Sequence, residues 1–167
     1  MKKIIYLITL LALLLVACGK DEKSFNFTVD EYESTLKSII DKNKGNSFIE
    51  MKSKTLVDDN YQIELAKGIT IVVKVNDDNK VTSVYGTASS DALLVYNKEL
   101  KIAYLALIKS VDGSLGTIQQ FTVFEKLGIT GDSKMLDHSG TYNLNDVSYV
   151  FKGDIENNTL ILKAEPK

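Results

Sequence analysis

The spacing of the apolar residues changes along the chain, and this change constrains the fold more than any other feature of the sequence. Apolar residues from Tyr32 to Ile40 recur at helical spacing, after Thr28 and Glu31, which have the spacing of a capping box. They predict a helix over about 29–43. Apolar residues then alternate with polar ones, as in strands with one buried face. The strands are expected at 47–57, 60–67, 69–76 and 80–86, with Gly68 as either a turn or a bulge in one long strand.

The helical spacing returns in the middle of the chain and then gives way to alternation again. Apolar residues three and four apart predict a long helix over 90–111, and its later half is apolar on every side. Such a helix is expected to be central and covered on more than one face. Thr117 and Gln120 have the spacing of a second capping box, before a short helix ended by Gly128. Three further strands are expected at 134–142, 146–153 and 159–164.

Runs of strands follow runs of helices, which is typical of an α+β fold with an antiparallel sheet packed on helices. The expected order is α-β-β-β-β-α-α-β-β-β. No Pro-rich or Ser-rich linker divides the halves, so residues 29–167 are expected to form a single globular domain. Two helices followed by three strands, with Lys126-Leu127-Gly128 at the second helix end, are similar in order to beta-lactamase inhibitory protein and to small outer-membrane assembly lipoproteins. Those families have two helices where the first half here has one.

The first seventeen residues have the composition of an export signal. Lys2 and Lys3 precede an almost unbroken apolar run from Ile4 to Ala17, as in the charged and apolar regions of a signal peptide. A helix needs about 20 apolar residues to cross the hydrocarbon of a bilayer, and this run ends sooner. We therefore expect residues 1–17 to be a signal peptide that is removed on export.

Leu15-Val16-Ala17-Cys18 resembles the lipobox of bacterial lipoproteins, and the cysteine at its end is the only one in the chain. The resemblance implies that Cys18 receives a diacylglycerol and a palmitate-type acyl chain and becomes the mature N-terminus. Two or three acyl chains anchor a protein to a bilayer almost irreversibly. Anchoring to the outside of the cell membrane is implied, or to the outer membrane in a diderm host, since Gly19 is unlike the Asp that retains lipoproteins in the inner membrane. Residues 18–28 are then a lipid-anchored tether.

The charges of the chain limit its partners. The 20 basic residues are all lysines and are balanced by 22 acidic ones, so no binding to nucleic acid is expected. Loss of Lys2 and Lys3 with the signal peptide takes the formal charge from −2 to −4. Contact with the membrane is therefore expected through the N-terminal lipid, not through net charge. A chain without arginine also lacks the planar bidentate clamp for phosphate or carboxylate.

Few residues suggest catalysis or metal binding. His138 is the only histidine, and its neighbours Asp137 and Ser139 would point to the opposite face of a strand, so they predict no Ser-His-Asp triad. Residues 77–79 (Asp-Asp-Asn) lack the spacing of an EF-hand and fit a hairpin turn. No catalytic residue, cofactor site or metal site is expected.

The expected function is that of a lipid-anchored envelope protein without enzymatic activity, which binds an envelope or extracellular protein or a ligand, as in immunity, exclusion, inhibition or assembly. Tyr85, Tyr142 and Tyr149 are the candidates for an exposed contact surface, and a partner strand is expected to add at the hairpin 146–164. Two alternatives stay open. One is an enzyme that acts on glycan or wall polymer through a carboxylate pair with a raised pKa. The other is a lipid or ligand carrier with an apolar cavity between the long helix and the sheet.

Acylation of Cys18 can be tested directly. We expect intact mass spectrometry of the protein extracted from membranes to show a chain that begins at Cys18 and carries the mass of a diacylglycerol and an acyl chain. The Cys18→Ala variant, which has no thiol to modify, should lack this added mass. A free thiol at Cys18 on a chain that still begins with Met1 would contradict the lipoprotein interpretation.

Overall fold

The computed structural model describes residues 23–45, 47–58, 60–130 and 132–167. The predictions for residues 1–17 and for Cys18 lie outside these residues. The strands are β1 (Ser53–Val57), β2 (Asn60–Ala66), β3 (Ile69–Val75), β4 (Val81–Ser89), β5 (Ser139–Leu144), β6 (Val147–Asp154) and β7 (Thr159–Pro166). The helices are α2 (Val29–Lys42), α3 (Ser90–Val95), α4 (Asn97–Val111), α5 (Thr117–Leu127) and a 3-10 helix (Ser133–Asp137). None of the described helices is long and apolar enough to cross a bilayer.

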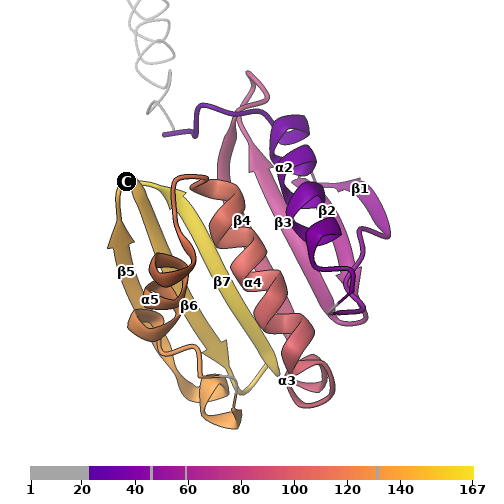
Figure 1. Ribbon diagram of the computed structural model, residues 1–167, viewed down its shortest axis with the longest axis vertical. Helices are drawn as coiled ribbons and strands as arrows, with labels where there is room; N and C mark the ends of the chain where they lie inside the picture. Colours follow the sequence, from indigo (N-terminus) through magenta and orange to yellow (C-terminus); the bar gives the residue numbers. More distant parts are fainter. Residues whose placement is uncertain (1–22, 46, 59, 131) are drawn as a thin grey trace, which may run out of the picture.

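The described strands form one seven-stranded antiparallel sheet in the order β1-β2-β3-β4-β7-β6-β5, with the helices on one of its faces (Figure 1). This confirms the predicted α+β class and the order of elements. The last strands of the two meanders, β4 and β7, pair in the middle of the sheet. Because β6 and β7 are each paired on both sides, the expected addition of a partner strand at the hairpin 146–164 is wrong. The edges are β1 and β5.

The core lies between the sheet and the helices, with α4 at its centre. α4 contacts β3, β4 and β7 below it and α2 and α5 beside it, so the prediction of a helix covered on more than one face is confirmed. Tyr104 and Leu107 of α4 are fully buried. Val84 and Leu162 of the two central strands are also fully buried and belong to the same core.

Three predicted elements differ from the structure. The predicted helix 90–111 breaks at Tyr96, whose backbone (φ −121°, ψ 36°) is not helical. Apolar spacing could not show this break, because the buried residues on either side of it keep the same spacing. Residues 133–137 form a 3-10 helix, not a strand, since the Asp132 side chain accepts the Lys134 N–H at 3.0 Å and caps it. The first strand covers only Ser53–Val57 of 47–57.

The helix ends and one turn depend on local hydrogen bonds. The Thr28 capping box is confirmed, because Glu31 N–H donates to Thr28 Oγ1 at 3.3 Å and Thr28 N–H donates to Glu31 Oε2 at 2.7 Å. The second capping box is wrong, because the N-cap is Gly116, which has no side chain to accept a hydrogen bond; only its N–H donates, to Gln119 Oε1 at 2.9 Å. Gly68 (φ +74°) makes the turn between β2 and β3. A register shift between Glu64 and Ala66 adds a bulge beside this turn.

The packing of α4 on β4 predicts a large effect of one methyl group. A Cβ on Gly86 would lie 2.9 Å from Tyr104 Cε1 and 3.1 Å from Leu107 Cδ1. We expect Gly86→Ala to lower the free energy of unfolding by about 1–3 kcal/mol, the usual cost of overpacking a core. Urea unfolding measures this. The matched control is Gly45→Ala, whose new Cβ would have nothing within 4 Å, and an equal loss in both variants would contradict the tight contact.

Candidate functional site

The N-terminal segment 25–28 is attached to the domain by backbone hydrogen bonds. Phe25 N–H donates to the Val81 carbonyl at 2.7 Å, and Val81 N–H donates to the Phe27 carbonyl at 3.1 Å. Phe25 is buried, and its ring stacks on the ring of Phe27 with the centroids 4.9 Å apart. The end of the predicted tether, from Phe25 on, is therefore part of the folded domain.

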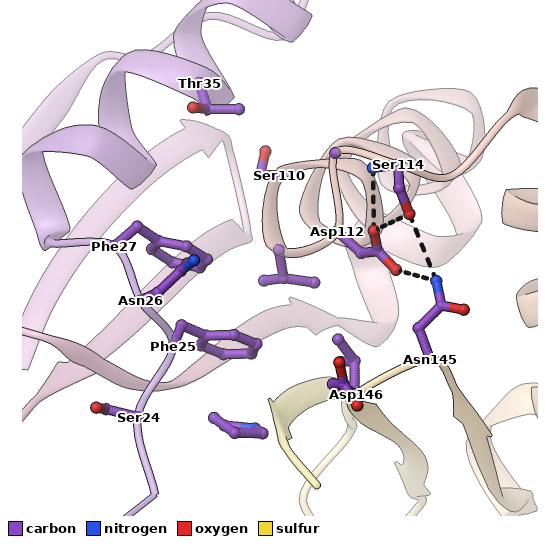
Figure 2. Close-up of a pocket in the computed structure, with 14 residues that line it drawn as sticks. Ser24, Phe25, Asn26, Phe27, Thr35, Ser110, Asp112, Ser114, Asn145 and Asp146 are labelled. Carbon is purple, nitrogen blue, oxygen red and sulfur yellow. Dashed lines mark hydrogen bonds between the residues drawn. The ribbon is translucent and has the colours of Figure 1, made fainter.

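A cleft of about 850 Å³ opens between this segment, the loop after α4, and the turn between β5 and β6. We call it the N-terminal cleft. In Figure 2, the rings of Phe25 and Phe27 lie on one side, and Asp112 and Asn145 lie on the other. Asp146 and the apolar Val111, Val147 and Pro166 also line it. The cleft thus has an aromatic wall and an acidic wall.

The acidic wall is held in place by hydrogen bonds to Asp112. Ser114 donates to Asp112 Oδ1 from its backbone N–H at 3.0 Å and from its hydroxyl at 2.5 Å, and Asn145 Nδ2 donates to Oδ2 at 2.6 Å. Partial burial raises the pKa of Asp112, but the hydrogen bonds from Ser114 and Asn145 outweigh it and hold the pKa below its usual range. Asp112 is therefore ionised at neutral pH.

Lys109 fixes the shape of the loop that carries Asp112. Its ammonium group donates to the Gly113 carbonyl at 2.6 Å and to the Leu115 carbonyl at 2.7 Å. Its positive charge also contributes to the lowered pKa of Asp112. The loop after α4 is thus held by side-chain to backbone contacts, as expected for a preformed wall.

The three tyrosines proposed as a contact surface do not lie together. Tyr149 is fully buried, and the pKa of its hydroxyl is raised by burial and then by the negative charge of Asp112. Its ring therefore lies inside the domain and cannot contribute to an exposed surface. Tyr142 is opposite Tyr149 in the sheet, is half-buried and faces the same side. Tyr85 follows the buried Val84 and so points to the face of the sheet without helices.

His138 has a structural role. It lies at the end of the 3-10 helix, before β5, and Nε2 donates to the Leu127 carbonyl at 3.0 Å. This carbonyl is one of those left without a partner at the end of α5. The ring covers Gly128, whose φ is +69° and where a Cβ would be 2.1 Å from Nε2. The imidazole therefore caps the C-terminal end of α5.

The Asp-Asp-Asn segment at 77–79 lies in a hairpin turn, as the sequence predicted. Residues 76–80 form the hairpin turn predicted at 77–79, with Asn76 Oδ1 accepting the N–H groups of Asp78 (3.1 Å) and Lys80 (2.9 Å). Within the described part of the chain, no group of three His, Cys, Asp or Glu side chains is placed to hold a metal ion.

The residues of the N-terminal cleft were not candidates in the sequence. Asp112-Gly113-Ser114 and Asn145-Asp146 have the composition of ordinary turns. Nothing local to either segment shows that they meet, since Asp112 and Asn145 are 33 residues apart. Phe25 and Phe27 lay in the predicted tether. The signal that could have placed them in the domain was the alternation of these apolar residues with polar ones, which is typical of a segment with one buried face.

Comparisons with protein-family models, with curated proteins and with solved structures each found no match to this chain. The interpretation of the N-terminal cleft therefore depends on its geometry and on the sequence.

The hydrogen bonds of Asp112 predict a pH-dependent effect of Asp112→Asn. The amide places a donor where Ser114 or Asn145 donates, so we expect a loss of about 1 kcal/mol in the free energy of unfolding at pH 7. The pKa of Asp112 is lowered in the folded protein, so its contribution is present above the usual value of 3.8 and is lost as the pH falls through the lower folded value.

Urea unfolding of both proteins at pH 7 and at pH 3 measures this. The wild type should lose more stability between the two pH values than Asp112→Asn does. Equal losses would show that the ionised Asp112 does not stabilise the fold.

Proposed function

We propose that the chain is a lipid-anchored envelope lipoprotein whose domain binds a segment of an envelope or extracellular protein in the N-terminal cleft, without catalysing a reaction. The observation that carries this proposal is the combination of a stacked aromatic wall and an ionised acidic wall in one cleft. Its volume of about 850 Å³ is within the range of about 300–1,000 Å³ that is common for binding pockets.

The position of the N-terminal cleft fits attachment through Cys18. Residues 19–24 separate Cys18 from Phe25. Even fully extended, the seven steps along the chain from Cys18 to Phe25 reach at most about 25 Å. An acyl anchor at Cys18 would therefore keep the cleft close to the outer surface of the membrane, where a partner from the envelope or from outside the cell could reach it.

The chemistry of the two walls suggests the partner. Asp112 and Asp146 attract a lysine or arginine side chain, because a hydrogen bond between ionised groups is stronger than a neutral one. The exposed parts of the Phe25 and Phe27 rings can pack against the aliphatic part of such a side chain. We therefore propose a basic residue with apolar neighbours as the segment that is bound.

The two alternative functions receive less support. Two carboxylates, Asp112 and Asp146, line one cleft, but an acid catalyst needs a raised pKa and the pKa of Asp112 is lowered. A carrier needs an apolar cavity between α4 and the sheet, yet Tyr104 is in contact with Gly86 there. Both observations favour binding in the N-terminal cleft.

Photo-cross-linking in intact cells tests the proposal. A p-benzoylphenylalanine at Asn26, an exposed residue of the cleft, should cross-link one discrete protein. The same group at Glu156, in the turn at the other end of the sheet, should not. Asp112→Asn should reduce the cross-linking by about tenfold, the effect of losing one charge-assisted contact. Asp77→Asn, which removes an exposed carboxylate outside the cleft, is the matched control.

Two outcomes would contradict the proposal. Equal cross-linking from Asn26 and Glu156, or none from Asn26 in protein acylated at Cys18, would show that the cleft does not bind a partner there. If the wild type instead hydrolysed purified wall fragments and Asp112→Asn did not, the result would support the alternative function, an enzyme that acts on wall polymer.

A further inference from the structure

A second, smaller hollow lies on the face of the sheet that the helices do not cover. Its volume is about 210 Å³. Lysines from three parts of the chain line it: Lys23 before the N-terminal segment, Lys74 on β3 and Lys163 on β7. Thr82, Ser83 and Tyr85 of β4 form its floor, and Glu165 and Pro166 complete it. We call this hollow the lysine pocket.

The sheet register brings two of the lysines to one aromatic ring. Lys163 is directly opposite Tyr85, and Lys74 is opposite Ser83, two residues before Tyr85 on β4. These residues share the open face, because alternate residues of a strand point the same way. The ammonium group of Lys74 lies 5.4 Å from the centroid of the Tyr85 ring, and that of Lys163 lies 5.6 Å from it. Two positive charges, one from β3 and one from β7, therefore lie beside the same ring.

The positive charge of the lysine pocket is only partly balanced by the described residues. Lys163 forms an ion pair with Glu165. Burial lowers the pKa of Lys163, but the contacts with Glu165 and Tyr85 outweigh it and raise the pKa, so the group stays charged. Among the described residues, neither Lys23 nor Lys74 forms an ion pair. Among the described lining residues, three ammonium groups and one carboxylate leave two positive charges, although the net charge of the chain is negative.

A bulge in β4 adds hydroxyl groups to this charge. The register shifts between Lys74 and Val75, which pair with Ser83 and Val81, so Thr82 has no partner residue on β3. Thr82 and Ser83 are both buried, and both line the pocket. Hydroxyl groups can donate hydrogen bonds to anionic oxygens, so the pocket combines ammonium groups with additional donors.

We propose that the lysine pocket binds a phosphate monoester. Such a group carries about −1.5 to −2 charge at pH 7 and three acceptor oxygens, which matches the two unbalanced positive charges and the surrounding donors. Lysine binds phosphate as a point charge, without the bidentate geometry that arginine supplies. The proposal does not depend on the N-terminal cleft. The phosphate can belong to a free solute or to a lipid headgroup, which an anchor at Cys18, five residues before Lys23, would bring close.

Titration of the isotope-labelled full chain with inorganic phosphate, in non-ionic detergent and at constant ionic strength, tests the proposal by NMR. We expect saturable shifts of the Thr82, Ser83 and Tyr85 amide signals. Lys74→Gln together with Lys163→Gln should weaken binding at least about tenfold, and Lys74→Gln alone should weaken it less. The matched control combines Lys126→Gln with Lys152→Gln. These lysines are exposed and lie outside the pocket, so this variant should bind as the wild type does.

Nanodiscs distinguish the source of the phosphate. If the same amide signals shift in discs that contain phosphatidic acid but not in discs of phosphatidylcholine alone, the pocket takes a headgroup. If they shift only with inorganic phosphate, it takes a free solute. Absence of saturable shifts in both arms, or equal binding by the wild type and by the double Lys74/Lys163 variant, would overturn the proposal, whatever the state of Cys18.

Discussion

The antiparallel pairing of β4 with β7 is the interaction on which the rest of the structure depends. It joins two meanders, each of which would otherwise expose the edge of its last strand, into one sheet. α4 packs across this junction, and Gly86 lets the Tyr104 ring approach the strand closely. With the helices on one face, the other face stays open (Figure 1). The sheet therefore offers its ends and its open face for binding.

Both proposed sites lie at the same end of the central strand pair, and they have opposite charge. The N-terminal cleft has an acidic wall around Asp112, and the lysine pocket surrounds Tyr85. Pro166, at the end of β7, lines both. An anchor at Cys18 would bring this end close to the bilayer. In that orientation the acidic cleft would bind a basic protein segment, and the lysine pocket would bind a phosphate group.

Helices and strands could be predicted where the pattern that specifies them lies within a few neighbouring residues. The Thr28–Glu31 capping box and the apolar stripe of α2 use contacts within a few residues, so the predicted helix ended within one residue of the observed one. The break at Tyr96 was missed, because apolar spacing continues across it. The cleft was missed for a different reason. Its walls come from separate loops, and the hydrogen bond between Asp112 and Asn145 joins residues that nothing in the sequence relates.

The sequence by itself determined the class of most segments, the turns between them and the lipobox pattern that ends at Cys18, because capping, turn residues and apolar period depend on neighbouring residues. Only the tertiary structure decided which strands are edges, which tyrosines are buried and which lysines line the same pocket. Lys23, Lys74 and Lys163 line one hollow although the net charge is negative. Their shared position depends on which distant strands pair, and this is set by the packing of the whole domain.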